Sequence, residues 1–296
     1  MSQLNPIHIS NLSKEYGSKN ALHSINLTIP KGSVVGILGP NGSGKTTLLK
    51  HITGMVLPSR GSVKTFGTEA KDLSENEIGR IGYVSQESEL MDWLTVGETV
   101  HLVSAHHVDW DSELANRLLA NFKLNNSDKV GGLSVGQKQR LSIILGVAHK
   151  PELLLLDEPA ASLDPIVRQD FLDLLMELIQ DPDRTIMISS HILTDVEKVI
   201  DQVLIIDNGG VHCFQPLDEL REQYHRIHLS ALDNELPKEL NFSHVKNQEH
   251  HGASAVVTVF NADRSQIEAE ANALNCRYEI KTLDFQEIYR LVVAGK

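Results

Sequence analysis

The feature that most constrains this chain is a glycine-rich loop between an apolar run and a helical pattern. The loop reads Gly39-Pro40-Asn41-Gly42-Ser43-Gly44-Lys45-Thr46. It follows Val34 to Leu38, a short run typical of a buried strand, and helical spacing continues from Lys45 to Ile52. Glycines let the backbone curl so that successive N–H groups face one anion, and the helix adds its positive dipole end. The pattern therefore predicts a phosphate-binding loop, which needs a strand before it and a helix after it.

A second apolar segment ends in two acidic residues. Leu153 to Leu156 is typical of a strand buried on both faces, and Asp157 and Glu158 follow it directly. Beside a phosphate-binding loop, such an aspartate reaches Mg²⁺ through a water, while Lys45 bridges the β- and γ-phosphates and Thr46 holds the metal. Glu158 lies just past the strand end, where a carboxylate polarises an attacking water. The two segments together predict a site for a nucleoside triphosphate and Mg²⁺.

Strand-like and helix-like segments alternate over roughly the first 210 residues, which indicates an α/β fold with a largely parallel sheet. The earliest segments, Ile7 to Leu12 and His23 to Ile29, alternate apolar and polar residues and favour an antiparallel flank. We expect one domain over residues 1–215 and a small α/β domain over residues 216–296. In the small domain we expect strands over 226–230, 255–260 and 277–280 and helices over 217–224, 265–274 and 285–293.

Composition excludes several classes of protein. The net charge of −12 argues against general nucleic-acid binding and against a polybasic membrane anchor. No apolar run reaches the roughly 18 residues of a membrane span, and Met1 to Asn11 does not resemble a secretory signal. The two cysteines, Cys213 and Cys276, form no close pair, which excludes a disulfide framework and fits a reducing compartment. We therefore expect a cytoplasmic protein.

Between the loop and the acidic strand end lies the segment Leu133-Ser134-Val135-Gly136-Gln137. It resembles the signature sequence of ATP-binding cassette (ABC) ATPases, whose common form is Leu-Ser-Gly-Gly-Gln. Further residues match that family in order along about residues 5–215: Tyr16 resembles the aromatic residue that stacks on adenine, Gln86 the Q-loop glutamine, Ser162-Leu163-Asp164 the D-loop, and His191 the switch histidine.

The resemblance implies an ABC ATPase core with a helical subdomain over about residues 87–145, in which two cassettes close head to tail around ATP. One copy would supply the adenine and phosphate contacts, the metal ligands and the catalytic groups: Tyr16, Gly39 to Thr46, Thr47, Gln86, Asp157, Glu158 and His191. The other copy would supply Ser134, Gly136 and Gln137, with Asp164 also counted among the nucleotide contacts. Glu158 would be the general base and His191 would contact the γ-phosphate, with Lys45 and Gln86 also catalytic. Thr46, Gln86 and Asp157 would hold Mg²⁺.

One residue departs from the signature. Val135 replaces the middle glycine, and valine adds bulk and does not readily take a positive φ. Valine is tolerated if it begins a helix with helical φ. We therefore expect function to be retained, with weakened closure of the dimer as the alternative.

As a function, we expect the ATPase subunit of a membrane transporter whose membrane-spanning part is a separate permease, so that this chain lies in the cytoplasm at the inner face of the cell membrane. Glu87 to Val100 resembles the stretch by which such cassettes dock on that permease, with Leu90 and Trp93 as candidate contacts; the alternative is that Trp93 packs within the cassette. Thr282 to Tyr289 is similar to the closing helix of many bacterial export cassettes, which favours export. The transported substrate stays open, because selectivity belongs to the permease.

The main alternative is a soluble ABC ATPase that acts on the ribosome or on DNA. Such proteins often have two cassettes in one chain, a coiled-coil insertion or basic arms, and none of these is visible in the sequence. A GTPase or small-molecule kinase is disfavoured because the guanine-reading Asn-Lys-x-Asp motif is missing. A non-hydrolysing clamp is disfavoured because Lys45, Glu158 and His191 are intact.

Overall fold

The computed structural model describes residues 5–87, 89–232, 236–237, 240–274 and 276–294. Its contacts divide the chain into two compact units, Met1–Phe214 and Gln215–Lys296. This division falls one residue before the boundary expected from the sequence. Among the helices of the described residues, none combines the length and the apolar character needed to cross a membrane.

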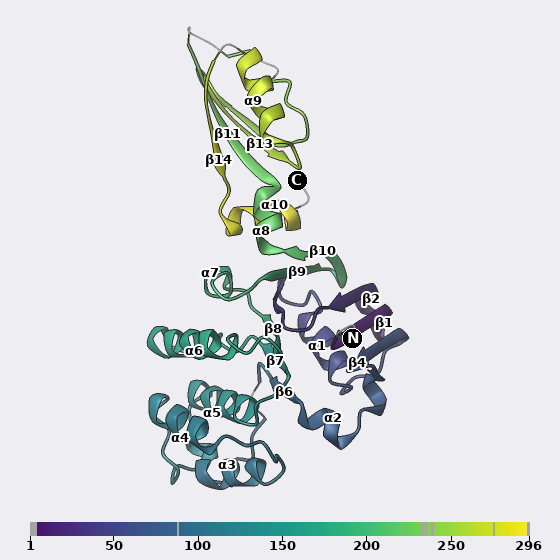
Figure 1. The fold of residues 1–296 in the computed structure, drawn as a ribbon, viewed down its shortest axis with the longest axis vertical. Helices are drawn as coiled ribbons and strands as arrows, with labels where there is room; N and C mark the ends of the chain where they lie inside the picture. The colour runs from purple at the N-terminus through teal and green to yellow at the C-terminus, as the bar shows by residue number, and fades with distance from the viewer. Residues whose placement is uncertain (1–4, 88, 233–235, 238–239, 275, 295–296) are drawn as a thin grey trace. The chain divides into compact units, whose positions relative to one another are not determined.

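A six-stranded sheet forms the centre of the first unit, in the order β10-β9-β3-β8-β7-β6 (Figure 1). The core strands β3 (Val34–Leu38), β7 (Leu153–Asp157) and β8 (Thr185–Ser189) are buried throughout and pair in parallel. Their continuous apolar runs fit strands that are covered on both faces. The parallel neighbours β6 (Ile81–Val84) and β9 (Gln202–Asp207) extend the sheet, and β10 (Gly210–Pro216) forms its edge.

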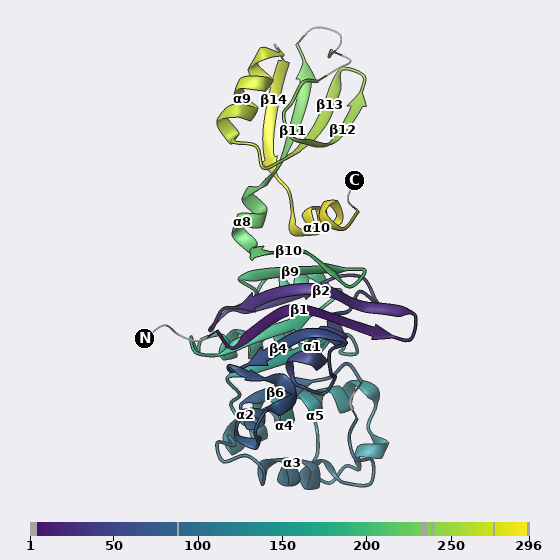
Figure 2. The ribbon, with the colours of Figure 1, turned by 90° about the vertical axis from the view of Figure 1, so that its right-hand side faces the viewer.

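A second, antiparallel sheet confirms the predicted flank. Its order is β2-β1-β4-β5, with bounds β1 (Ile7–Tyr16), β2 (Lys19–Ile29), β4 (Arg60–Thr65) and β5 (Thr68–Glu69) (Figure 2). The helix α1 (Lys45–Ile52) packs in one apolar cluster with both sheets, through Leu48, Leu49 and Ile52. The helix that follows the loop is therefore packed against both sheets.

Helices surround the central sheet, and three of them form the expected helical region: α3 (Val96–Ser104), α4 (Ser112–Asn121) and α5 (Val135–Val147) (Figure 1). Thr95 caps the start of α3 and Ser134 caps the start of α5, each with a capping box that satisfies free N–H groups at the helix start. The remaining helices are α2 (Glu75–Gly79), α6 (Pro165–Leu178) and α7 (Leu193–Val196).

The second unit contains an antiparallel sheet in the order β12-β13-β11-β14. Its strands are β11 (Tyr224–Ala231), β12 (Val245–His251), β13 (Ser254–Phe260) and β14 (Cys276–Thr282). The helices are α8 (Leu217–Glu222), α9 (Arg264–Ala273) and α10 (Phe285–Ala294), and α9 packs on one face of the sheet through Ile267 and Ala271. The expected strands and helices are present, and β12 is an additional strand.

Candidate nucleotide site

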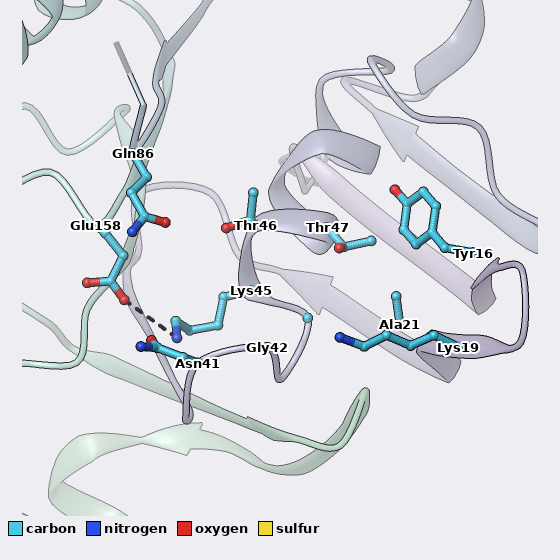
Figure 3. A pocket seen from close by; sticks show the side chains of 11 residues that line it. Tyr16, Lys19, Ala21, Asn41, Gly42, Lys45, Thr46, Thr47, Gln86 and Glu158 are labelled. Carbon is cyan, nitrogen blue, oxygen red and sulfur yellow. Dashed lines mark ion pairs between the residues drawn. The ribbon is translucent and has the colours of Figure 1, made fainter.

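A pocket of about 460 Å³ opens at the glycine-rich loop (Figure 3). Its lining comes from the loop, from the β1–β2 hairpin and from the ends of β6 and β7: Tyr16, Lys19, Ala21, Asn41, Gly42, Gly44, Lys45, Thr46, Thr47, Gln86 and Glu158. Gly39, Pro40 and Ser43 belong to the same loop. Residues predicted from distant parts of the sequence therefore meet at one cavity.

The turn into α1 requires glycine at position 44. Gly44 has φ of +111°, a conformation that other residues rarely adopt. A side chain at Gly44 would also place its Cβ 2.6 Å from Leu22 and 2.7 Å from the carbonyl oxygen of Ala21. The helix begins directly after this glycine, at Lys45. Its free N–H groups therefore lie at the pocket, where they are available to an anion.

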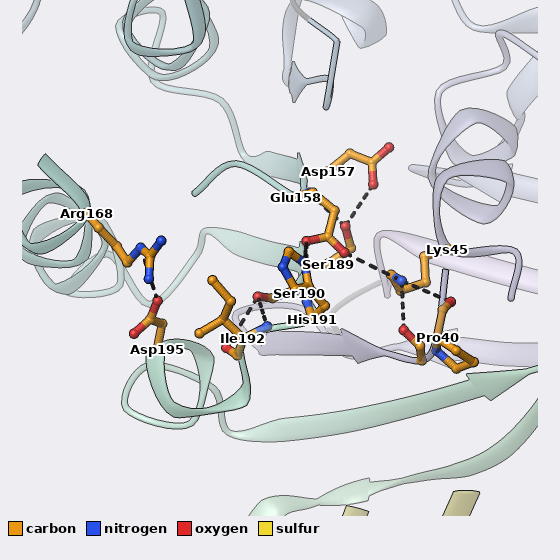
Figure 4. Close-up of polar contacts among 11 residues, drawn as sticks. Pro40, Lys45, Asp157, Glu158, Arg168, Ser189, Ser190, His191, Ile192 and Asp195 are labelled. Carbon is orange, nitrogen blue, oxygen red and sulfur yellow. Dashed lines mark hydrogen bonds and ion pairs between the residues drawn. The ribbon is translucent and has the colours of Figure 1, made fainter. Parts of the chain in front are cut away.

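The ammonium group of Lys45 is held at the end of the pocket. It donates to the carbonyl oxygens of Gly39 at 2.8 Å and Pro40 at 3.3 Å, and its Nζ lies 3.5 Å from Oε1 of Glu158 (Figures 3 and 4). Both charged side chains are only 6% exposed. Because the pair is shielded from water, the attraction between the two charges is stronger than it would be at the surface. An arriving phosphate would compete with these oxygens for the same ammonium group.

The catalytic candidates lie at the ends of β7 and β8 (Figure 4). His191 Nδ1 lies 2.7 Å from Oε2 of Glu158, and the His191 backbone N–H donates to the same oxygen at 3.3 Å. The backbone N–H of Glu158 donates to Oγ of Ser189, and that hydroxyl donates to Oδ1 of Asp157, each at 2.8 Å. Asp157, Glu158 and His191 thus form one connected network through Ser189.

Several buried polar atoms of this region have no hydrogen-bond partner within the described part of the chain. They are Ser43 Oγ, Tyr83 OH, Asp157 Oδ2 and Glu158 Oε1, the last of which still forms the ion pair with Lys45. Burial, with the nearby Asp157 charge, raises the pKa of Tyr83 well above its ordinary value. Buried oxygens without partners are rare in folded proteins because they lose their hydration. Mg²⁺ prefers oxygen ligands, and both Asp157 Oδ2 and the Thr46 hydroxyl could bind it. These two residues therefore fit a bound metal.

The signature residues lie outside this pocket. Ser134 Oγ accepts from the Gln137 N–H at 3.3 Å, and Gln137 Oε1 accepts from the Ser134 N–H at 2.9 Å, so both residues cap α5. Asp164 caps α6 and forms an ion pair with Arg140 at 2.6 Å. Within one copy of the chain, none of the predicted residues Ser134, Gly136, Gln137 and Asp164 lines the loop pocket.

The helix start explains why valine is accepted in the signature. Val135 is the first residue of α5 and is 72% exposed, so its side chain is not crowded by the described residues. A Cβ on Gly136, in contrast, would lie 2.8 Å from the carbonyl oxygen of Ser162. The second glycine is therefore needed for packing.

Two pocket residues and one network residue were not predicted from the sequence. Lys19 and Ala21 line the pocket, and Lys19 is the cross-strand partner of Tyr16 in the β1–β2 hairpin. The signal was the short turn Tyr16-Gly17-Ser18-Lys19, which forces the two side chains together. Ser189 is the register partner of Asp157 on adjacent strands, and a polar residue at the end of an apolar strand was its signal.

Known proteins similar to this chain are ATP-binding proteins of transporters. Residues 22–161 match the protein family described as ABC transporter. The lantibiotic transport ATP-binding protein SrtF of Streptococcus pyogenes is 37% identical over 207 residues, which cover 69% of this chain and 88% of that protein. The bacitracin transport ATP-binding protein BcrA of Bacillus licheniformis is 34% identical over 220 residues, covering 73% and 72%.

A solved structure is also similar. It is a dimeric ATP-binding cassette in a post-hydrolysis state with ADP and Pi, with 28% identity and a TM-score of 0.63. The alignment covers 71% of this chain and 98% of that chain. These relatives do not favour the ribosome- or DNA-acting alternative.

Proposed function

This chain belongs to the ATP-binding proteins of ABC transporters, and on that premise we propose that it closes on ATP with a second copy of itself and drives export through a separate permease. It is an ATP-binding, ATP-hydrolysing subunit. The observation that supports the mechanism best is the cluster of Lys45, Glu158 and His191 at the end of the loop pocket. Two relatives named for bacitracin and lantibiotic transport support the assignment to export.

The nucleotide would lie along the pocket, with its base at Tyr16 and its phosphates at the loop. Tyr16 is 50% exposed, and Lys14 Nζ lies 5.0 Å from the centroid of its ring. With a cation over one face of the ring, the other face would take the base by stacking. The N–H groups at the start of α1, the Lys45 ammonium and Lys19 would then receive the negative charge of the phosphates.

Thr46 and Asp157 would hold Mg²⁺, with Gln86 reaching it from the end of β6. Support comes from the unpaired Asp157 Oδ2 and from the position of Thr46 and Gln86 on the pocket wall. When bound, the metal would neutralise charge that develops on the phosphates.

Glu158 would accept a proton from the attacking water. One of its oxygens is engaged by His191, and the other faces Lys45. When Lys45 moves its ammonium group to a phosphate, Oε1 of Glu158 loses its ionic partner and becomes free to accept. His191 would hold the carboxylate in place and contact the γ-phosphate.

A second copy would complete the site. Ser134, Gly136 and Gln137 lie outside the pocket of their own chain, and we propose that they contact the nucleotide of the partner copy. The solved relative is a dimer, which supports the same arrangement. ATP would therefore join two copies, and hydrolysis would release them.

The permease would dock at a groove between β6 and α5. The groove is lined mainly by strand β6, the segment after it and one face of α5: Ile81, Tyr83, Ser85, Glu89, Leu90, Ser142, Leu145, Gly146 and His149. Trp93 is 71% exposed and precedes α3, so it does not pack within that helix. A large exposed aromatic side chain is a common anchor of protein interfaces.

The test of this function is affinity capture of the tagged chain from its native membranes in mild detergent, with and without ATP and vanadate. We expect a stoichiometric multi-span membrane protein, and Trp93→Ala should reduce its recovery. Val108→Ala is the matched control, because Val108 is also exposed in the helical region. Recovery of ribosomal proteins or DNA-repair factors, with no membrane protein, would contradict the proposal.

A further inference from the structure

Ser189 lies at the end of β8, directly beside the end of β7. It is the register partner of Asp157 in the parallel pair of these strands, and it is fully buried. Its hydroxyl accepts from the backbone N–H of Glu158 and donates to Oδ1 of Asp157, both at 2.8 Å (Figure 4). One oxygen atom thus contacts both acidic residues of the proposed hydrolytic site.

The contact with Asp157 sets the direction of its carboxylate. A serine hydroxyl has one hydrogen, and here that hydrogen is used by Oδ1. The other oxygen, Oδ2, is buried and has no hydrogen-bond partner among the described residues. The hydroxyl therefore fixes one end of the carboxylate and leaves the other end for a ligand. This is the arrangement by which a second layer of residues orients a metal ligand.

The contact with Glu158 holds an unusual backbone conformation. Glu158 has φ of +48°, in the left-handed region that residues other than glycine rarely adopt. Such a conformation persists only when surrounding contacts hold it in place. The hydrogen bond that the Glu158 backbone N–H donates to Ser189 Oγ is one such contact, and the one that Glu158 Oε2 accepts from the His191 backbone N–H is another. Without the hydroxyl, the backbone at Glu158 is less constrained.

We propose that Ser189 is a positioning residue for ATP hydrolysis, which aims Asp157 at the metal and Glu158 at the attacking water through one hydroxyl. This inference rests on the proposed roles of Asp157 and Glu158. The atom at this position must accept one hydrogen bond and donate another. Threonine also has a hydroxyl on its Cβ, so it can make the same two hydrogen bonds. Ser190 cannot substitute for it, because its hydroxyl bonds the backbone of Ile192.

The experiment compares Ser189→Ala, Ser189→Thr and the parent as full-length proteins. The first readout is the ATPase rate as a function of Mg²⁺ concentration. The second needs no turnover: the affinity for Mn²⁺ in the presence of the non-hydrolysable analogue AMP-PNP, from the loss of the free Mn²⁺ signal in electron paramagnetic resonance. For Ser189→Ala we expect kcat and Mn²⁺ affinity each to fall by about 10–100-fold, the usual effect of losing such a partner of a metal ligand. Ser189→Thr should recover most of both.

The matched control is Ser33→Ala, the same substitution at another buried hydroxyl. Ser33 is 6% exposed, donates to the carbonyl oxygen of Pro30 and precedes β3 at the strand end away from the loop. It should keep the parental kcat and Mn²⁺ affinity.

Three results would overturn the inference: Ser189→Ala with parental values, Ser189→Thr as weak as Ser189→Ala, or an equal loss in Ser33→Ala. A parent that hydrolyses ATP without any need for a divalent metal would instead contradict the proposed roles of Asp157 and Thr46.

Discussion

The loop at Gly39–Thr46 and the segment at Leu133–Gln137 are both proposed to contact the nucleotide phosphates, but their polar atoms have different partners within the chain. Around the loop, buried atoms such as Ser43 Oγ and Asp157 Oδ2 lack partners among the described residues. In the second segment, Ser134 and Gln137 satisfy each other as a helix cap. The loop side therefore leaves buried oxygens available to a ligand, while Ser134 and Gln137 on the signature side already satisfy each other.

This difference fits the proposal that one copy of the chain contains only half of each complete nucleotide site. The cap uses the Ser134 hydroxyl as an acceptor, so its hydrogen stays available to a phosphate of the partner copy. Ser134 could thus bind a phosphate while it continues to cap α5. Substitutions on the loop side should act on chemistry and affinity, and those on the signature side should act on closure.

The largest effect is expected for Glu158→Gln, which keeps the shape of the side chain and removes the proton acceptor. The ATPase rate should fall by at least about 100-fold, because general-base catalysis usually contributes that much. ATP binding should be kept, and ATP should trap a dimer, which size-exclusion chromatography with ATP would detect. Hydrolysis at the parental rate would exclude Glu158 as the base.

A smaller effect is expected for Gly136→Ala. The added Cβ would meet the Ser162 carbonyl oxygen at 2.8 Å and would shift the start of α5. Overpacking of this kind costs about 1–3 kcal/mol, so the ATPase rate should fall by about 10-fold through weaker closure. The neighbouring control is Val135→Gly, which should change the rate by less than about 2-fold, since Val135 is exposed. Equal effects at the two positions would contradict the packing argument.

Lys19→Ala tests the pocket residue that the sequence did not reveal. Loss of one exposed cation near the proposed phosphate position should weaken ATP binding by about 5-fold, which corresponds to about 1 kcal/mol, with kcat unchanged. Fluorescence titration with an ATP analogue would measure it, and the parent should show the steeper dependence on salt. Lys64→Ala, at an exposed lysine of β4, should leave the affinity unchanged.

The smallest expected effect is on how folding stability depends on pH, through a buried histidine of the helix that follows the loop. His51 lies on α1, is 1% exposed, and places Nδ1 2.7 Å from the Thr47 carbonyl oxygen. Burial lowers the pKa of His51 below its ordinary value of 6.5. The unfolded chain therefore binds this proton more readily than the folded chain. The stability that neutral His51 contributes is present above about pH 6.5 and declines as the pH falls toward the lowered folded value.

The measurement is the urea midpoint of unfolding at pH 7, 6 and 5. It should decline over this range in the parent, and the decline should be shallower in His51→Gln, even though that variant is less stable at pH 7. His212→Gln, at an exposed histidine of β10, should follow the parent. A parental slope in His51→Gln would assign the pH dependence to other groups.

Much of the fold was predictable because its signals are local. Val34–Leu38 and Leu153–Leu156 are apolar over their full length, and both form buried strands of the parallel sheet. Strand β12 was missed because its sequence, VKNQEHH, is polar and almost entirely exposed. It is a strand because it pairs with β13, and its own sequence does not predict that pairing.

The same distinction applies to the candidate site. The loop and the acidic strand end form patterns along the chain, so their residues could be singled out in advance. Lys19 and Ser189 matter through a partner in another part of the sequence, Tyr16 in one case and Asp157 in the other. Such residues become visible only when the register of two strands is known.

The close contact of Gly44 with Leu22 and Ala21 has a consequence for the choice of nucleotide. It packs the end of the loop, where α1 begins, against the hairpin that carries Tyr16, so the distance between Tyr16 and the first turn of α1 depends on this packing. Stacking on an aromatic ring reads the flat face of a base and tolerates different bases. If the base stacks on Tyr16 as proposed, the pocket would select for the length of the phosphate chain more strictly than for the identity of the base.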